Sequence, residues 1–208
     1  MVPKLICLCV GYLCGCPLTG ELVARSMTGK SAFEIGDGNP GMANVGHELG
    51  TTAAALCLAG DILKTLLPVL LMSRLFPQLG WHVATAWTGL GATLGHIWPF
   101  WHGFRGGKGV TTIFSTIILM QPLFGILAGI VSIVTIVLSG YLSVGAVVGM
   151  LFYTIATALK LPRDCAFVSL VFTVLQLITH GSKLRGILNG TTRRASISTK
   201  FWSAVRKR

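Results

Sequence analysis

The stretch TTAAALCLAGDILKTLLPVLLMS, residues 51–73, decides the fold, because it is long enough to cross a membrane and carries only two charges, Asp61 and Lys64. An α-helix rises 1.5 Å per residue, so roughly 20 apolar residues cross the hydrocarbon core of a bilayer. Lipid offers no partners to backbone N–H and C=O groups, so a crossing segment is helical or part of a closed barrel. The run is too long and too unalternating for a barrel strand. It therefore predicts a transmembrane helix.

The rest of the chain has the same character. Of its 208 residues 52% are hydrophobic and 11% are charged, whereas a soluble domain is about 25% charged. Two of its further apolar runs, 110–120 and 123–138, fall short of the roughly 20 residues that a crossing needs. We predict an all-α integral membrane protein with about seven transmembrane helices, in one domain over 1–190 followed by a basic tail over 191–208. The further apolar segments are 4–24, 82–101, 110–120, 123–138, 141–159 and 164–180.

The distribution of basic residues predicts the orientation. With the amino terminus outside and seven crossings, twelve of the 17 Lys and Arg residues lie on the inner side, four lie on the outer side and Lys64 lies within a span. An excess of Lys and Arg marks the cytoplasmic side, so the carboxyl terminus is predicted to be cytoplasmic. The polar stretches 25–50, 102–109 and 180–192 then face the cytoplasm. The net charge of +11 predicts membrane lipids as partners of the tail. It does not predict nucleic acid, because the rest of the chain lacks a basic face.

Asp61 and Lys64 are costly where they lie, at roughly 2.5–3.5 kcal/mol per charge in mid-membrane. Three residues apart on a helix, they share a face and can neutralise one another. Two interpretations are open: a structural ion pair near the inner end of the helix, or a site in which Lys64 points at an anion while Asp61 holds it. His96 and His102 do not match a metal-binding spacing, and the sequence implies no metal and no cofactor.

Two glycine-rich stretches carry the remaining signal. GFRGGKGV, 103–110, places two cations beside a flexible turn and before a helix, and a helix amino terminus with a nest of amides binds anions. A helix–helix turn with surface cations is the alternative. The loop is not a Walker A motif, because Gly109 replaces the hydroxyl residue that this motif requires. FEIGDGNPGMANVGHELG, 33–50, combines a turn with polar side chains at Asn44 and His47. A connector of this kind is more typical of a site-forming loop than of a passive link.

Together these segments resemble the PlsY-type bacterial membrane acyltransferases, over about residues 11–190. GHIWPFWHGFRGGKGVTT, 95–112, resembles that family's G-H-x-F-P-x-F-x-x-F-K-G-G-K-G-V-A-T, and GNPGMANV, 38–45, is similar to its G-N-P-G-A-T-N-V. Asp61 and Lys64 fit its D-x-x-K pattern. The resemblance implies seven helices with the amino terminus outside, in the cytoplasmic membrane of a bacterium. It implies transfer of an acyl chain from acyl phosphate to the sn-1 hydroxyl of glycerol 3-phosphate. The product is lysophosphatidic acid, for phospholipid biosynthesis, made at a site facing the cytoplasm.

The resemblance also implies roles for individual residues. Lys108 would hold a phosphate with the amides of the glycine loop, and His180 would orient the attacking hydroxyl or act as its base. Lys64 or Arg105 would bind the second phosphate, and Asn39 and Asn44 would shape the site. The implied substrate-binding positions are Gly38, Asn39, Gly41, Asn44, Lys64, Arg105, Gly106, Gly107 and Gly109.

The chain departs from the family pattern at several positions. Among them, Asp37 stands where the family has serine, His47 where it has arginine and Lys183 where it has asparagine. An added acid near two phosphates is unfavourable unless Lys183 or His47 offsets it. These departures leave open a catalytically altered or inactive homologue that binds phosphate-bearing lipid precursors. A small membrane transporter is a further alternative, because Asp61 and Lys64 lie within a span. Transporters often contain inverted repeats, and the halves 1–100 and 101–208 show no such symmetry.

Overall fold

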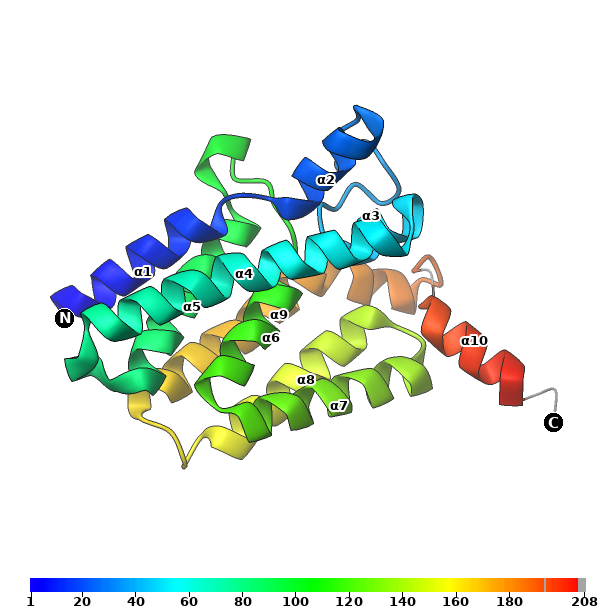
Figure 1. Cartoon of the computed structure of the whole chain (residues 1–208). Helices are drawn as coiled ribbons and strands as arrows, with labels where there is room; N and C mark the ends of the chain where they lie inside the picture. Colours follow the sequence, from blue (N-terminus) through cyan, green and yellow to red (C-terminus); the bar gives the residue numbers. More distant parts are fainter. Residues whose placement is uncertain (193, 206–208) are drawn as a thin grey trace. The chain divides into compact units, whose positions relative to one another are not determined.

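The computed structural model describes residues 1–192 and 194–205, and in this part of the chain every regular element is helical. The chain forms two compact units, Met1–Met120 and Gln121–Arg208. Figure 1 labels the helices and colours them along the sequence. The all-α prediction therefore holds for the described residues, while the division into a domain over 1–190 and a tail over 191–208 stays a prediction.

The first unit contains six α-helices and two short 3₁₀ turns among its described elements. Helices α1, α4, α5 and α6 pack on one another, and α2 and α3 pack against α4. The elements are α1 (Val2–Gly15), α2 (Thr19–Thr28), α3 (Met42–Leu49), α4 (Thr51–Leu75), η1 (Pro77–Leu79), α5 (Gly80–Ile97), η2 (Phe100–His102) and α6 (Val110–Met120).

Helices α1 and α5 lie side by side along their length, and small residues on both let them approach closely. A Cβ added at Gly91 would overlap the carbonyl oxygen of Leu8, and one added at Gly11 would overlap that of Thr88. Gly11 is followed four residues later by Gly15, and Gly91 by Gly95. Such glycine spacing lets membrane helices pack backbone to backbone. The carboxyl-terminal end of α5, in turn, contacts the glycine-rich segment 103–109.

The first apolar segment, predicted as one run over 4–24, is broken in the structure. Helix α1 ends at Gly15 and α2 begins at Thr19, with Pro17 between them. Proline has no N–H to continue a helix and restricts the residue before it, which explains the break. The break leaves the carbonyl oxygen of Pro17 available to a side chain, and Lys64 uses it.

The second unit holds a helical pair, α7 with α8, against which α9 and α10 pack. Helix α9 packs on α8, and α10 packs on α7. Helix α9 continues beyond the end predicted at residue 180, because the polar residues that follow, Lys183 and Arg185 among them, are compatible with a helix. The basic tail is not wholly irregular, since it contains α10. The helices are α7 (Pro122–Ser139), α8 (Leu142–Thr157), α9 (Arg163–Leu188) and α10 (Ser196–Val205).

Four stretches are long and apolar enough to cross a membrane, the first of them comprising both α1 and α2: Val2–Thr28, Thr51–Leu75, Pro122–Ser139 and Arg163–Leu188. Val110–Met120 and Leu142–Thr157 are shorter apolar helices. Large apolar side chains are exposed along α7, among them Leu123, Ile126, Ile130, Ile133, Val134 and Leu138. Exposed apolar surface of this kind is stable in contact with lipid rather than with water.

Candidate active site

The glycine-rich segment between α5 and α6 makes a sharp turn before α6 begins. The carbonyl oxygen of Pro99 accepts hydrogen bonds from the backbone N–H groups of His102 (3.2 Å) and Phe104 (3.0 Å). Gly103 has φ +60° and Phe104 has φ +57°. A bulky residue with positive φ is strained, and such strain clusters at functional sites. Arg105, the residue that follows Phe104, is exposed.

The middle of this segment is seated on the carboxyl-terminal end of α5. The backbone N–H of Gly107 donates to the carbonyl oxygen of His96 at 3.0 Å, and that of Arg105 donates to the carbonyl oxygen of His102 at 3.2 Å. A Cβ at Gly107 would overlap Nε2 of His96, and a Cβ at Gly106 would overlap the His96 carbonyl oxygen. Glycine at these positions is therefore required for contact with α5. The backbone N–H groups of Gly107 and Arg105, which were expected to face an anion, are thus hydrogen-bonded to carbonyl oxygens of the protein.

A buried polar network lies directly beneath the segment. Lys64 Nζ is 2.8 Å from Asp61 Oδ1 and 2.7 Å from His96 Nδ1, and it donates to the carbonyl oxygen of Pro17 at 2.8 Å. Thr19 Oγ1 donates to Asp61 Oδ1 at 3.2 Å. The side chains of Asp61, Lys64 and His96 are only 2%, 8% and 4% exposed. All three donors of the Lys64 ammonium thus have partners within the protein.

The tautomer of His96 follows from this network. An ammonium group is a donor only, so the 2.7 Å contact makes Nδ1 of His96 the acceptor. The His96 Nδ1 atom is 3.6 Å from Asp61 Oδ1, which is too long for a hydrogen bond. The ring therefore carries its hydrogen on Nε2, the atom that lies against Gly107.

The second glycine-rich stretch is shaped by one buried amide. Asn44 Nδ2 donates to the carbonyl oxygens of Ile35 (3.0 Å) and Asn39 (2.9 Å), and its Oδ1 accepts from the backbone N–H of Asp37 (2.8 Å). Asn39 Oδ1 accepts from the backbone N–H of Gly41 at 2.9 Å. Asn44 lies on α3, so this helix fixes the course of residues 35–41 through three hydrogen bonds.

A buried carboxylate fixes the entry to the same stretch. Glu21 on α2 is 2% exposed. Its Oε2 accepts from Ser31 Oγ at 2.8 Å and from the backbone N–H of Ala32 at 2.7 Å, while its Oε1 accepts from Arg25 Nε. Glu21 was not predicted as a site residue. The signal that could have indicated it is the rarity of acidic residues, because the chain has only six.

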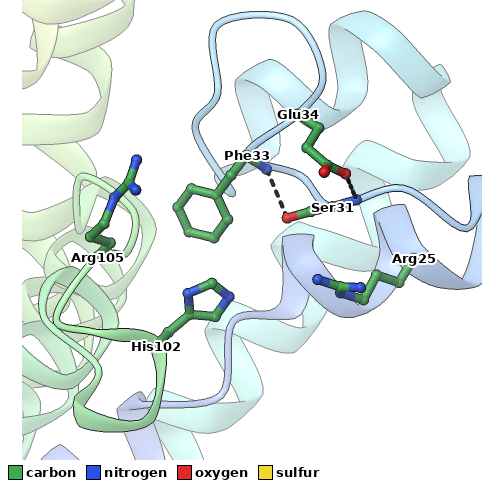
Figure 2. Close-up of a pocket in the computed structure, with 6 residues that line it drawn as sticks. All are labelled: Arg25, Ser31, Phe33, Glu34, His102 and Arg105. Atoms are coloured by element: carbon green, nitrogen blue, oxygen red, sulfur yellow. Dashed lines mark hydrogen bonds between the residues drawn. The ribbon is translucent and has the colours of Figure 1, made fainter.

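The two glycine-rich segments meet at a polar cavity of about 310 Å³. Phe33 lies between two other lining residues. Its ring centroid is 4.7 Å from the ring centroid of His102 and 5.8 Å from the Cζ atom of the Arg105 guanidinium. Figure 2 shows the Arg105 and Arg25 side chains on opposite sides of this aromatic pair. Glu34 accepts from the backbone N–H of Ser31, which holds its carboxylate within the second segment. The lining residues are Arg25, Ser31, Phe33, Glu34, His102 and Arg105.

The structure brings together only some of the predicted site residues. Arg105 lines the cavity, and Lys108 is half-buried in the segment beside it without lining it. Lys64 lies in the network with Asp61 and His96. His47 Nδ1 is 2.7 Å from Glu48 Oε1, in an exposed position.

The remaining predicted positions are distributed over both units. Asn39, Gly38 and Gly41 belong to the stretch held by Asn44, and Asp37 is exposed there. His180 and Lys183 lie on α9 in the second unit, where His180 is buried and Lys183 is half-buried. The cavity residues Phe33 and Arg25 were not predicted as site residues. An isolated aromatic and a cation near a helix end carry no sequence signal of their own.

Comparison with known proteins decides the family. The family model described as glycerol-3-phosphate acyltransferase matches residues 5–190. The chain belongs to this glycerol-3-phosphate acyltransferase family. A glycerol-3-phosphate acyltransferase of Halalkalibacterium halodurans is 32% identical over 189 residues, covering 86% of this chain and 89% of the relative. One of Salmonella paratyphi B is 36% identical over 201 residues, covering 95% of this chain and 92% of the relative.

Two solved structures share the fold of this acyltransferase family member. They are crystal structures of PlsY (YgiH), an integral membrane glycerol 3-phosphate acyltransferase, in a glycerol 3-phosphate form (TM-score 0.83) and a lysophosphatidic acid form (TM-score 0.82). Each is 27% identical and covers 93% of this chain and 96% of its own. These findings confirm the resemblance seen in the sequence, the multi-pass membrane character and the class of enzyme. They do not favour the non-catalytic or transporter alternatives.

Proposed function

We propose that this acyltransferase moves an acyl chain from acyl phosphate to the sn-1 hydroxyl of glycerol 3-phosphate, releasing lysophosphatidic acid and inorganic phosphate. The observation that carries this proposal is the cavity at which the two glycine-rich segments meet. Arg105 and Arg25 line it on opposite sides, Arg25 being paired with Glu21, and Ser31, Glu34 and His102 add groups that can hydrogen-bond. A confined space with guanidinium groups on either side suits a phosphate ester. The relatives' names and the glycerol 3-phosphate form of PlsY support this choice of acceptor.

The chemistry requires little covalent help from the protein. The sn-1 oxygen attacks the carbonyl carbon of acyl phosphate, a C–O ester bond forms, and the phosphate leaves with the electron pair of the cleaved bond. Because acyl phosphate is a mixed anhydride, positioning and charge stabilisation are the main tasks. We assign Lys108 and the glycine segment to one phosphate and Arg105 to the other. We assign His180 to orienting the hydroxyl or accepting its proton, since a neutral imidazole near pH 7 is suited to that.

The geometry supports a revised role for Lys64. Its three donors are directed to Asp61, His96 and the Pro17 carbonyl oxygen, so we assign it to holding His96 under the glycine segment rather than to touching substrate. Asn39 and Asn44 keep their proposed role of shaping the site, which their hydrogen bonds to residues 35–41 support. An offset of Asp37 by Lys183 or His47 remains part of the proposal.

We further propose seven crossings of the bacterial cytoplasmic membrane, with the amino terminus outside and the active site facing the cytoplasm. Each of the seven apolar segments of the sequence corresponds to helix in the structure, the first to the broken pair α1 and α2. The excess of Lys and Arg on one side supports the orientation. A site that opens between membrane helices would accept an acyl tail directly from the lipid phase.

The test compares Lys108→Ala with Lys160→Ala, a cation whose ammonium lies 4.7 Å from the Phe124 ring centroid in the second unit. Purified protein receives acyl phosphate and labelled glycerol 3-phosphate, and lysophosphatidic acid is quantified. We expect Lys108→Ala to lower kcat/KM by about 100-fold, as loss of a charge-stabilising group does, and Lys160→Ala to leave it unchanged. Wild-type protein that binds glycerol 3-phosphate without acylating it would refute the proposed reaction. Full activity of Lys108→Ala would refute the role of the loop alone.

A further inference from the structure

Helix α10 is fastened to the end of an apolar span. The backbone N–H of Ala195 donates to the carbonyl oxygen of Gly140 at 2.8 Å, and Ser198 Oγ donates to the carbonyl oxygen of Val137 at 2.9 Å. Trp202 Nε1 donates to the same Val137 oxygen at 3.1 Å. These carbonyls lie in and just beyond the last turn of α7, where backbone acceptors have no intrahelical partner. The helix is therefore held at the level where the α7 span ends.

The surface of α10 is apolar on one side. Ile197 and Phe201 lie four residues apart and share a face, and they are 49% and 46% exposed. Trp202, 39% exposed, lies next to Phe201 with ring centroids 5.4 Å apart. Thr199 and Ser203 are exposed at the polar positions of the helix. These three apolar side chains are therefore only partly covered within the described part of their unit.

The charge of this region has one sign only. Residues 191–208 contain six basic residues and no acidic residue. Arg194, two residues before α10 begins, is exposed. The basic residues are Arg193, Arg194, Lys200, Arg206, Lys207 and Arg208.

We propose that α10, which lies in a stretch of sequence whose charges are all basic, binds a surface of anionic phospholipid headgroups, with Ile197, Phe201 and Trp202 inserted at the level of the acyl-chain boundary. An amphipathic helix with Trp and Phe on one face and Lys and Arg beside it binds in the plane of an anionic interface. Leu138 on the last turn of α7 is 65% exposed, so the apolar side of α10 adjoins a span surface that faces lipid. A nucleic acid would match the charge but not the exposed aromatic side chains, and a second copy of this chain would bring like charge to the surface.

The test uses the full chain in proteoliposomes of fixed composition, phosphatidylcholine with phosphatidylglycerol. In one preparation the phosphatidylglycerol carries bromine, and in the other the phosphatidylcholine carries it at the same mole fraction. Quenching at Trp202 is the difference between wild type and Trp202→Phe, with both proteins shown by thermal unfolding to be folded. We expect brominated phosphatidylglycerol to quench at least about twofold more, because the attraction of basic residues to anionic headgroups enriches this lipid nearby.

Two controls connect the enrichment to the basic residues. The variant R194Q/K200Q/R206Q should bring the two quenching values together, as should 1 M salt, at which charges are screened beyond about 3 Å. The variant K160Q/R163Q removes one cation from the α8–α9 connection and one from the first position of α9, and it should retain the difference. Equal quenching by both lipids in wild type would overturn the proposal. So would weak quenching that depends on protein concentration, which would show that a second copy covers the helix. Neither readout depends on acyl transfer.

Discussion

Gly107 and His96 make two contacts at once: the Gly107 N–H donates to the His96 carbonyl oxygen at 3.0 Å, and the His96 imidazole occupies the space that a Gly107 side chain would need. The ring is held in that place by Lys64. The requirement for glycine at 107 therefore comes from the protein's own interior. Glycine in a phosphate-binding loop is often explained by the close approach of the ligand to the backbone. Here the contact of the loop with α5 requires glycine at position 107.

A double-mutant cycle tests this relationship. Gly107→Ala should displace the segment and raise KM for glycerol 3-phosphate by about tenfold, which corresponds to about 1.4 kcal/mol. His96→Ala removes the ring and should weaken binding on its own. In the double variant the added methyl group has room. The fold-increase in KM of the double variant should therefore be smaller than the product of the two single fold-increases, with a coupling of about 1 kcal/mol. Steady-state kinetics with acyl phosphate in excess provides the measurement.

Gly129→Ala is the matched control for this cycle, because an added Cβ there meets nothing within 4 Å. It should leave KM unchanged. Strictly multiplicative effects in the cycle would show that Gly107 is glycine for another reason, such as contact with the substrate itself.

The buried pair of Asp61 and Lys64 predicts an asymmetry in stability. Lys64→Met leaves the Asp61 carboxylate buried with only Thr19 as a hydrogen-bond donor among the contacts seen here. It should cost about 3–5 kcal/mol, the usual cost of breaking a buried pair. D61N/K64M removes both charges and should recover much of that loss. Thermal unfolding of the purified variants in detergent would show this. A double variant less stable than Lys64→Met would show that the loss in Lys64→Met does not come from an uncompensated Asp61 carboxylate.

Asn44 offers a finer test of the second glycine-rich stretch. Asn44→Ala removes all three hydrogen bonds to residues 35–41, and leaving buried partners unsatisfied costs about 1–3 kcal/mol per group. Asn44→Asp keeps the acceptor for the Asp37 N–H but loses both donors. We expect cleavage within residues 35–41 during limited proteolysis to increase in the order wild type, Asn44→Asp, Asn44→Ala. Equal resistance of all three proteins would show that other contacts hold this stretch.

The α1–α5 contact predicts which glycines the fold cannot lose. Gly91→Ala places a Cβ on the Leu8 carbonyl oxygen, so the two helices must separate along their shared face. Overpacking of this kind costs about 1–3 kcal/mol. The thermal midpoint should fall for Gly91→Ala and stay near the wild-type value for Gly129→Ala. Similar midpoints for the two variants would indicate that α1 and α5 are less closely packed than described.

Sequence reasoning located the helices well because membrane insertion requires long apolar runs, and the run 110–120 matches α6 at both ends. It missed the break at Pro17, since Cys16 and Leu18 on either side are as apolar as a continuous helix would be. It left two roles open for Lys64, because spacing shows that Asp61 is near but does not show His96, 32 residues away. Phe33 could not be found from sequence, because its place in the cavity depends on contacts with His102 and Arg105.

The interruption between α1 and α2 helps to stabilise the buried charges of Asp61 and Lys64. A continuous helix would direct the Pro17 carbonyl oxygen to its own backbone, and Lys64 would lose one of its three acceptors. Thr19, the first residue of α2, would lose its place beside Asp61. The break between α1 and α2 thus supplies hydrogen-bond partners to the buried Lys64–Asp61 pair. A variant that restored a continuous helix there, as Pro17→Leu is designed to do, would remove a partner of the Lys64 ammonium and so weaken its hold on His96.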